Sequence, residues 1–108
     1  MTFMANPTRL ELMEKRARDR PEDTFARYAV GMEYAGAGRV EDAIRSYQSL
    51  RESHPGYLAT YYQLGKNLEK LGRVAEAKEI YEQGIEVARR AGNNHTLGEL
   101  EDALELLR

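Results

Sequence analysis

The amino-acid sequence repeats itself at a spacing of 34 residues. When residues 24–57 are laid on residues 58–91, eight of the 34 positions are identical, whereas about two identities are expected by chance at ordinary residue usage. The identical pairs are Tyr28/Tyr62, Gly31/Gly65, Gly38/Gly72, Arg39/Arg73, Val40/Val74, Ala43/Ala77, Tyr47/Tyr81 and Glu52/Glu86. A fixed period of about 20 to 50 residues is typical of a solenoid, in which each repeat buries its apolar face against the next.

Each copy carries the spacing of two α-helices. Apolar residues recur at steps of three and four, which places them along one stripe of a helix. The stripes are formed by Val30, Tyr34, Ala37, Val40, Ile44, Tyr47 and Leu50 in the first copy and by Tyr61, Leu64, Leu68, Leu71, Val74, Ala77, Tyr81 and Ile85 in the second. Gly38 and Gly72 interrupt the stripe, because glycine readily adopts the left-handed conformation that ends a helix. The pattern predicts helices over residues 22–36, 40–53, 57–71 and 74–91.

The order of residues in each copy resembles the tetratricopeptide repeat. The pattern of that family is Trp, Leu-Gly and Tyr on a first helix, then Ala, Phe and Pro on a second. The first copy reads Arg27, Val30-Gly31, Tyr34, Ala43, Tyr47 and Pro55, and the second reads Tyr61, Leu64-Gly65, Leu68, Ala77, Tyr81 and Arg89. The resemblance implies an all-α fold, a right-handed α-solenoid of antiparallel helix pairs. It also places Ala43 and Ala77 opposite Gly31 and Gly65, where a missing Cβ lets the paired helices approach closely.

Three residues depart from the family pattern. Arg27 stands in the place of the tryptophan, and Leu50 stands where a small residue is usual. Arg89 replaces the proline of the second copy, and no helix-breaking residue follows before Gly92. We therefore expect the last helix of the second copy to be longer than its counterpart in the first.

The segments on either side of the two copies complete the stack. Residues 8–19 carry an apolar face and precede Pro21, which predicts the second helix of an incomplete repeat. Residues 94–107 carry a leucine stripe beside several acidic residues, as expected of a closing helix that covers the last repeat. The expected architecture is one domain, residues 1–108, with about six helices. Its layout resembles the small stand-alone tetratricopeptide proteins of bacteria.

Composition narrows the range of functions. The net charge is -2 and cysteine is absent, so disulfides and thiolate metal sites are excluded. Positive and negative residues are interspersed, without the basic stripe of a nucleic-acid-binding protein. The N-terminal segment from Met1 to Pro7 lacks the pattern of a secretory signal, and no apolar run approaches the roughly 18 residues of a membrane span. We expect a cytoplasmic protein that binds neither nucleic acid nor membrane.

The sequence contains no constellation of residues that indicates catalysis. His54 and His95 are 41 residues apart and lack neighbouring metal ligands at a useful spacing. The glycines are not followed by the Lys-Ser/Thr of a phosphate-binding loop, and no serine stands in a nucleophile elbow. We expect no catalytic, metal or cofactor site, and the protein is not predicted to be an enzyme.

A candidate binding surface lies on the other face of the first helix of each copy. Tyr34, Tyr47, Tyr61 and Tyr81 fall at core positions, whereas Tyr28 and Tyr62 fall on the face that resembles the concave lining of tetratricopeptide grooves. The predicted binding residues are Phe25, Tyr28, Met32, Tyr62, Lys66, Glu69 and Lys70. The expected function is a protein-interaction scaffold that binds a peptide or a helix in a shallow concave groove. The alternative is a structural module that forms homo-oligomers through this face or through an end helix.

Overall fold

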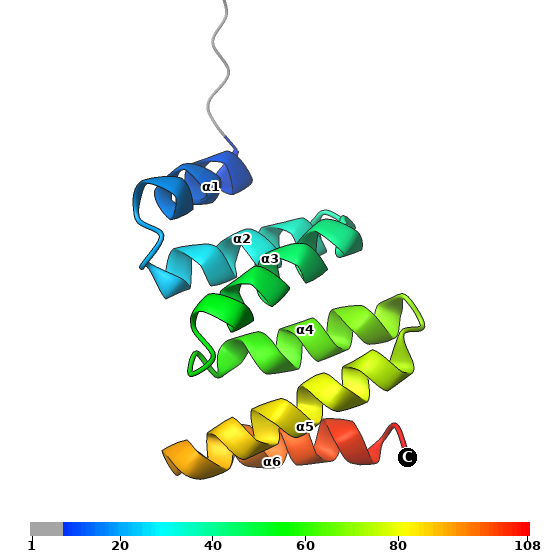
Figure 1. Ribbon diagram of the computed structural model, residues 1–108. Helices are drawn as coiled ribbons and strands as arrows, with labels where there is room; N and C mark the ends of the chain where they lie inside the picture. The colour runs from blue at the N-terminus through cyan, green and yellow to red at the C-terminus, as the bar shows by residue number, and fades with distance from the viewer. Residues whose placement is uncertain (1–7) are drawn as a thin grey trace, which may run out of the picture.

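The computed structural model describes residues 8–108, in which six α-helices follow one another without a strand (Figure 1). The segment Met1 to Pro7, on which the expectation of no secretory signal rests, lies outside the described residues. Each helix packs on the next one along the chain, and α4 also contacts α2 and α6. This arrangement confirms the all-α solenoid of helix pairs. The helices are α1 (Arg9–Asp19), α2 (Thr24–Gly36), α3 (Val40–Ser53), α4 (Ala59–Lys70), α5 (Val74–Ala91) and α6 (Asn94–Glu105).

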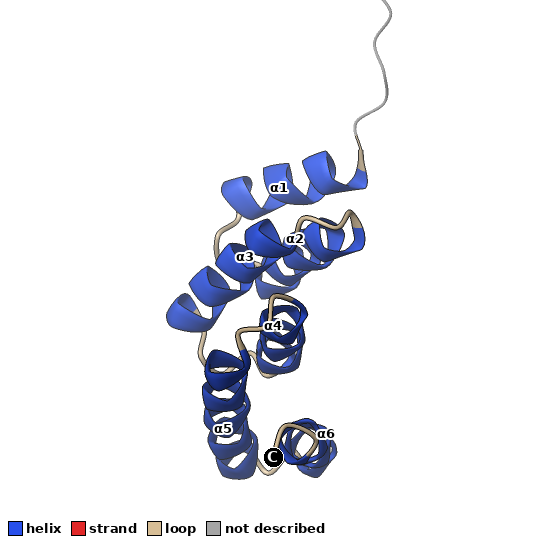
Figure 2. Cartoon of the chain, turned by 90° about the vertical axis from the view of Figure 1, so that its right-hand side faces the viewer, coloured by secondary structure: helices blue, strands red, loops and turns tan. Residues whose placement is uncertain are grey.

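The helices divide into two sides of the stack. Figure 2 shows α2, α4 and α6 on one side, which we call the inner side, and α3 and α5 on the other, which we call the outer side. The contacts of α4 with α2 and α6 agree with this division. Helix α6 therefore occupies the place that the first helix of a third repeat would take.

Local signals set the helix ends close to their predicted positions. The side chains of Thr8, Asp23 and Asn93 accept hydrogen bonds from backbone N–H groups of α1, α2 and α6, at 3.0–3.1 Å. Because Asp23 caps α2, this helix begins two residues after the predicted start. Helix α5 has 18 residues and α3 has 14, which confirms the longer final helix. Gly92 ends α5 with a left-handed φ of 69°.

Glycine and tyrosine fit together inside each helix pair. A Cβ atom at Gly65 would lie 2.1 Å from Cε1 of Tyr81, and one at Gly31 would lie 2.3 Å from Cε1 of Tyr47. Ala43 and Ala77 are fully buried, as their predicted core positions require. The atoms nearest to a Cβ at either glycine nevertheless belong to the tyrosine rings, so the expected position of the alanines opposite the glycines stays a prediction. The second-helix tyrosines thus reach across their own helix pair rather than only between pairs.

The two buried tyrosines differ in how their hydroxyl groups are satisfied. The Tyr81 hydroxyl donates to the Glu69 carboxylate, whereas the Tyr47 hydroxyl is buried without a hydrogen-bond partner among residues 8–108. The residue of the first copy that corresponds to Glu69 is Ala35, 34 positions earlier. Burial raises the pKa of both hydroxyls, and the bond to Glu69 raises that of Tyr81 further.

This difference predicts opposite effects for the same substitution. Tyr47→Phe removes an unsatisfied hydroxyl and is expected to raise the free energy of unfolding by about 1 kcal/mol. Tyr81→Phe removes a hydrogen bond to a charged group and is expected to lower it by about 1.5 kcal/mol. Urea denaturation of both variants and the wild type measures the two values. Equal losses in both variants would contradict the assignment of the Tyr47 hydroxyl as unpaired.

Candidate partner-binding groove

The structure separates the predicted binding residues into exposed and half-buried groups. On α2, Phe25 is 67% exposed and Met32 is 47% exposed. Tyr28 and Tyr62 are half-buried, since both side chains pack against the core. The ring centroid of Tyr28 lies 5.8 Å from that of Tyr47. The two tyrosines therefore serve the fold as well as the surface.

A hollow on the inner side brings Tyr28 and Tyr62 together. This aromatic hollow has a volume of about 420 Å³. It is lined by Tyr28, Tyr57, Leu58, Ala59, Tyr62, Gln63, Asn93, Thr96 and Glu99. Tyr57, which precedes α4, places its ring centroid 5.8 Å from that of Tyr28, and burial raises the pKa of both hydroxyls. The Tyr28 and Tyr57 hydroxyls therefore remain protonated at neutral pH, so these two residues offer uncharged aromatic surface with hydroxyl donors.

A second, smaller hollow continues from Tyr62 along α4 and α6. It has a volume of about 180 Å³ and is called the α6 hollow. Its lining consists of Tyr62, Lys66, Glu99, Asp102, Ala103 and Leu106. The Lys66 ammonium lies 5.5 Å from the centroid of the Tyr62 ring, within reach of a cation–π interaction. Because Tyr62 and Glu99 line both hollows, the two hollows together form one groove along the inner side.

Four of the seven predicted residues stand outside the lining of these hollows, namely Phe25 and Met32 on α2 and Glu69 and Lys70 on α4. Glu69 accepts the hydrogen bond from Tyr81 and lies 3.6 Å from the Lys66 ammonium. Its carboxylate is thus engaged within the protein and orients Lys66. Lys70 is exposed in the last turn of α4, where a positive charge is favoured by the helix dipole.

The predicted set lacks the residues that α6 contributes. Thr96, Glu99, Asp102 and Leu106 line the groove from this helix, and Leu106 is 80% exposed. They recur at steps of three and four, on a face different from that of the buried Leu100 and Leu104. The sequence already contains this spacing. Because residues 94–107 were expected only to cover the last repeat, their second face was not considered for binding.

Residues 8–108 lack two other kinds of functional feature. In this range no three His, Asp or Glu side chains gather in a way that could hold a metal ion. None of the six described helices is both long and apolar enough to cross a membrane. His54 lies near Arg27 and Ser53, with its Nδ1 atom 3.4 Å and 3.0 Å from them, and His95 pairs with Glu99 at 2.9 Å.

Comparisons with known proteins agree with this architecture. Residues 34–93 match the model of the family described as the tetratricopeptide repeat. The TPR repeat-containing protein PA0015 of Pseudomonas aeruginosa is 30% identical to this chain over 91 residues, which cover 84% of this chain and 87% of that protein. Proteins built from such repeats generally mediate protein–protein interactions and are generally non-enzymatic scaffolds.

Solved structures show the same arrangement of helices. A tetratricopeptide repeat domain protein from Salinibacter ruber is 41% identical in its crystal structure, with a TM-score of 0.75 over 79% of this chain and 94% of that chain. Its solution structure is 42% identical, with a TM-score of 0.78 over 82% and 89%. Protein BPP2914 from Bordetella parapertussis, at 24% identity and a TM-score of 0.80 over 94% and 89%, shares the fold. The family match, the relative and these structures together show that the chain belongs to the tetratricopeptide repeat family.

Proposed function

We propose that this protein is an interaction scaffold that binds a peptide or a helix of another protein in the groove on its inner side. The observation that carries the proposal is the continuity of the two hollows through Tyr62 and Glu99. Large exposed apolar side chains accompany the groove. Phe25 and Met32 share the Tyr28 face of α2 by helical spacing, and Leu106 directly follows α6. Exposed apolar groups gathered around a concave surface are typical of a protein-binding site.

The chemistry of the groove favours a partner segment with both apolar and charged side chains. Tyrosine rings supply a large contact area at a low cost in conformational entropy. Lys66 stands on one wall of the α6 hollow and Glu99 and Asp102 stand on the other. Charges of both signs orient a partner segment rather than attract it in bulk. A purely acidic or purely basic segment is therefore a poor match for this surface.

Substitution of the two exposed residues of α2 tests the groove. We expect Phe25→Ala combined with Met32→Ala to weaken partner binding by about tenfold or more, because both side chains offer contact area that the fold does not use. The wild-type protein is first used to capture partners from an extract of the source cells. The captured protein is identified by mass spectrometry, and its affinity for each variant is measured by calorimetry.

Leu12→Ala is the matched control for this experiment. Leu12 is an apolar side chain with 49% exposure on α1, a helix that contributes no residue to either hollow, whereas α2 contributes Tyr28. Its substitution is expected to leave partner affinity unchanged. If the double variant keeps its melting temperature and binds as tightly as the wild type, the partner uses another surface and the proposal is wrong. Light scattering of the wild type identifies the case in which the captured partner is a second copy of the chain.

A further inference from the structure

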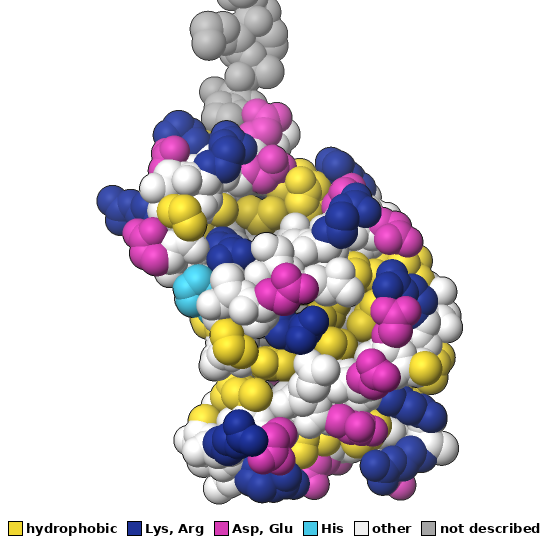
Figure 3. All heavy atoms as spheres, in the orientation of Figure 1, with side chains coloured by type: hydrophobic (Ala, Val, Ile, Leu, Met, Phe, Trp, Pro, Cys, Tyr) yellow, Lys and Arg dark blue, Asp and Glu magenta, His cyan; other side chains and the backbone are white. Residues whose placement is uncertain are grey.

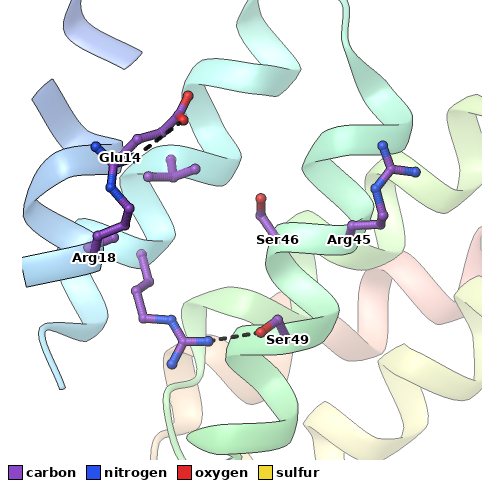
Figure 4. Close-up of a pocket in the computed structure, with 8 residues that line it drawn as sticks. Glu14, Arg18, Arg45, Ser46 and Ser49 are labelled. Atoms are coloured by element: carbon purple, nitrogen blue, oxygen red, sulfur yellow. Dashed lines mark hydrogen bonds and ion pairs between the residues drawn. The ribbon is translucent and has the colours of Figure 1, made fainter. Parts of the chain in front are cut away.

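A separate hollow opens on the outer side of the stack, between α1 and α3. It has a volume of about 340 Å³, at the lower end of the range of roughly 300–1,000 Å³ for ligand pockets. We call it the arginine hollow, and its lining consists of Glu14, Ala17, Arg18, Arg27, Val30, Arg45, Ser46 and Ser49. Figure 4 shows Arg18 and Glu14 paired on the α1 side of the hollow, across from Ser46 and Ser49 of α3.

Arg27 lies on the α2 side of this hollow and has unusual partners. Its guanidinium donates to Ser49 Oγ at 3.0 Å and to Ser53 Oγ at 2.7 Å. It also lies 3.4 Å from His54 Nδ1 and 3.5 Å from the Pro21 carbonyl oxygen. None of these groups is a carboxylate, and within residues 8–108 Arg27 forms no ion pair. A half-buried guanidinium held only by neutral groups keeps its full charge available for an anion.

The second copy shows why the first contains a hollow. Tyr61, Leu64 and Ile80 correspond to Arg27, Val30 and Ser46, and they are 2%, 0% and 7% exposed. Large apolar side chains therefore fill the space in the second copy that smaller or polar ones leave open in the first. The hollow is a property of this part of the chain and not of the repeat pattern.

The charge of the hollow is also specific to the first copy. Residues 34 positions after Arg18 and Arg45 are Glu52 on α3 and Glu79 on α5, so the sign of both charges is reversed at the corresponding positions one repeat further along the stack. The hollow has three arginines against one carboxylate, Glu14. Figure 3 views the molecule from this side and shows apolar surface below α1 flanked by Lys or Arg side chains. Apolar surface bordered by like charges is complementary to an acidic ligand.

Arg18 and Arg45, which stand at the rim of the hollow, are available for a ligand. Their side chains are 68% and 66% exposed, and Arg18 lies 4.0 Å from Glu14, at the limit of an ion pair. Arg45 is paired with Asp42, but a guanidinium has five N–H donors and this contact uses few of them. Guanidinium groups bind carboxylates through two parallel hydrogen bonds. The Ser46 and Ser49 hydroxyls add further polar groups to the lining.

We propose that the arginine hollow binds the carboxylate side chains of an acidic segment of a partner protein. One carboxylate pairs with the Arg27 guanidinium inside the hollow, and neighbouring carboxylates pair with Arg18 and Arg45 at the rim. The site is independent of the inner groove, which lies on the opposite side of α2 and shares no lining residue with it. The scaffold then has two binding surfaces of different chemistry.

Titration of the full chain with an acetylated and amidated hexaglutamate peptide tests the proposal. The amide signals of Arg18, Ser46 and Ser49 in ¹H–¹⁵N spectra are expected to shift most and to reach saturation, while hexaglutamine leaves them unchanged. Arg27→Gln is expected to weaken hexaglutamate binding about fivefold or more. Arg18→Gln combined with Arg45→Gln is expected to do the same, and its exposed positions keep the test valid if Arg27→Gln fails to fold.

Arg90→Gln is the matched control. The Arg90 side chain is 76% exposed on α5, and its substitution removes one positive charge outside the lining of the arginine hollow. Its affinity for hexaglutamate is expected to equal that of the wild type. Shifts spread evenly over the basic surface, or equal losses in Arg90→Gln and in the rim variant, would overturn the proposal. Inorganic phosphate that binds the hollow more tightly than hexaglutamate would also overturn it, in favour of a free-anion site.

Discussion

Leu100→Ala is expected to lower the free energy of unfolding by about 2–5 kcal/mol, the cost of removing a large side chain from a packed core. Leu100 is 0% exposed and belongs to the core cluster that extends from α3 to α6. A Cβ atom at Gly84 of α5 would lie 2.8 Å from Leu100 Cδ1. The leucine therefore rests directly on the α5 backbone, and alanine would leave a cavity at the junction that holds α6 to the stack.

Leu106→Ala, in the turn that ends the same helix, supplies the control for this change. Leu106 is 80% exposed, so its truncation is expected to change the free energy of unfolding by less than about 0.5 kcal/mol. Chemical denaturation followed by circular dichroism measures both variants. Similar small effects at Leu100 and Leu106 would mean that α6 is only loosely attached, which would also remove one wall of the proposed groove.

Gly65→Ala is expected to destabilise the protein by about 3 kcal/mol, at the upper end of the range for overpacking. The added methyl group would lie 2.1, 2.5 and 2.8 Å from three atoms of the Tyr81 ring. Tyr81 is 0% exposed and its hydroxyl is bonded to Glu69, so the ring cannot move aside without breaking other contacts. The helices α4 and α5 would have to separate to admit one carbon atom.

Gly98→Ala provides the opposite result in the same protein. Gly98 lies inside α6, and a Cβ atom there would meet nothing within 4 Å. Alanine is the better helix former, so this variant is expected to gain about 0.5–1 kcal/mol. Thermal unfolding of the two glycine variants measures the difference. A Gly65→Ala protein as stable as the wild type would show that the close contact with Tyr81 is absent in solution.

Much of the fold could be predicted from the spacing of residues. The bounds of α3 and α5 agree with the predicted ranges 40–53 and 74–91, because each helix is set between a glycine turn and a clear breaker. The division into a half-repeat at 8–19, repeats at 24–57 and 58–91, and a closing helix at 94–107 stays a prediction, although the helices fall within these units. The role of the tyrosine rings against Gly31 and Gly65 was not predicted, because sequence spacing does not give side-chain reach.

The groove could be predicted only in part. Tyr28 and Tyr62 stand out because they recur one period apart without belonging to the apolar stripe. Their depth of burial depends on Tyr57, in the turn before α4, and on the position of α6, and both are tertiary features. The arginine hollow was also not predicted. In the sequence Arg27 is only a departure from the family pattern, and its hydrogen bonds to Ser49 and Ser53 depend on the tertiary structure.

The lack of any fully buried residue in α1 has a consequence for how the molecule opens. Helix α4, by contrast, has six buried residues and is packed between neighbours on both sides. Local stability follows the number of buried apolar contacts, so the backbone amides of α1 exchange with solvent at a lower opening free energy than those of α4. The cooperative unit of the protein is then α2 to α6. Helix α1 can unfold locally while the remainder stays folded. An acidic ligand bound between α1 and α3 would stabilise the folded state of α1.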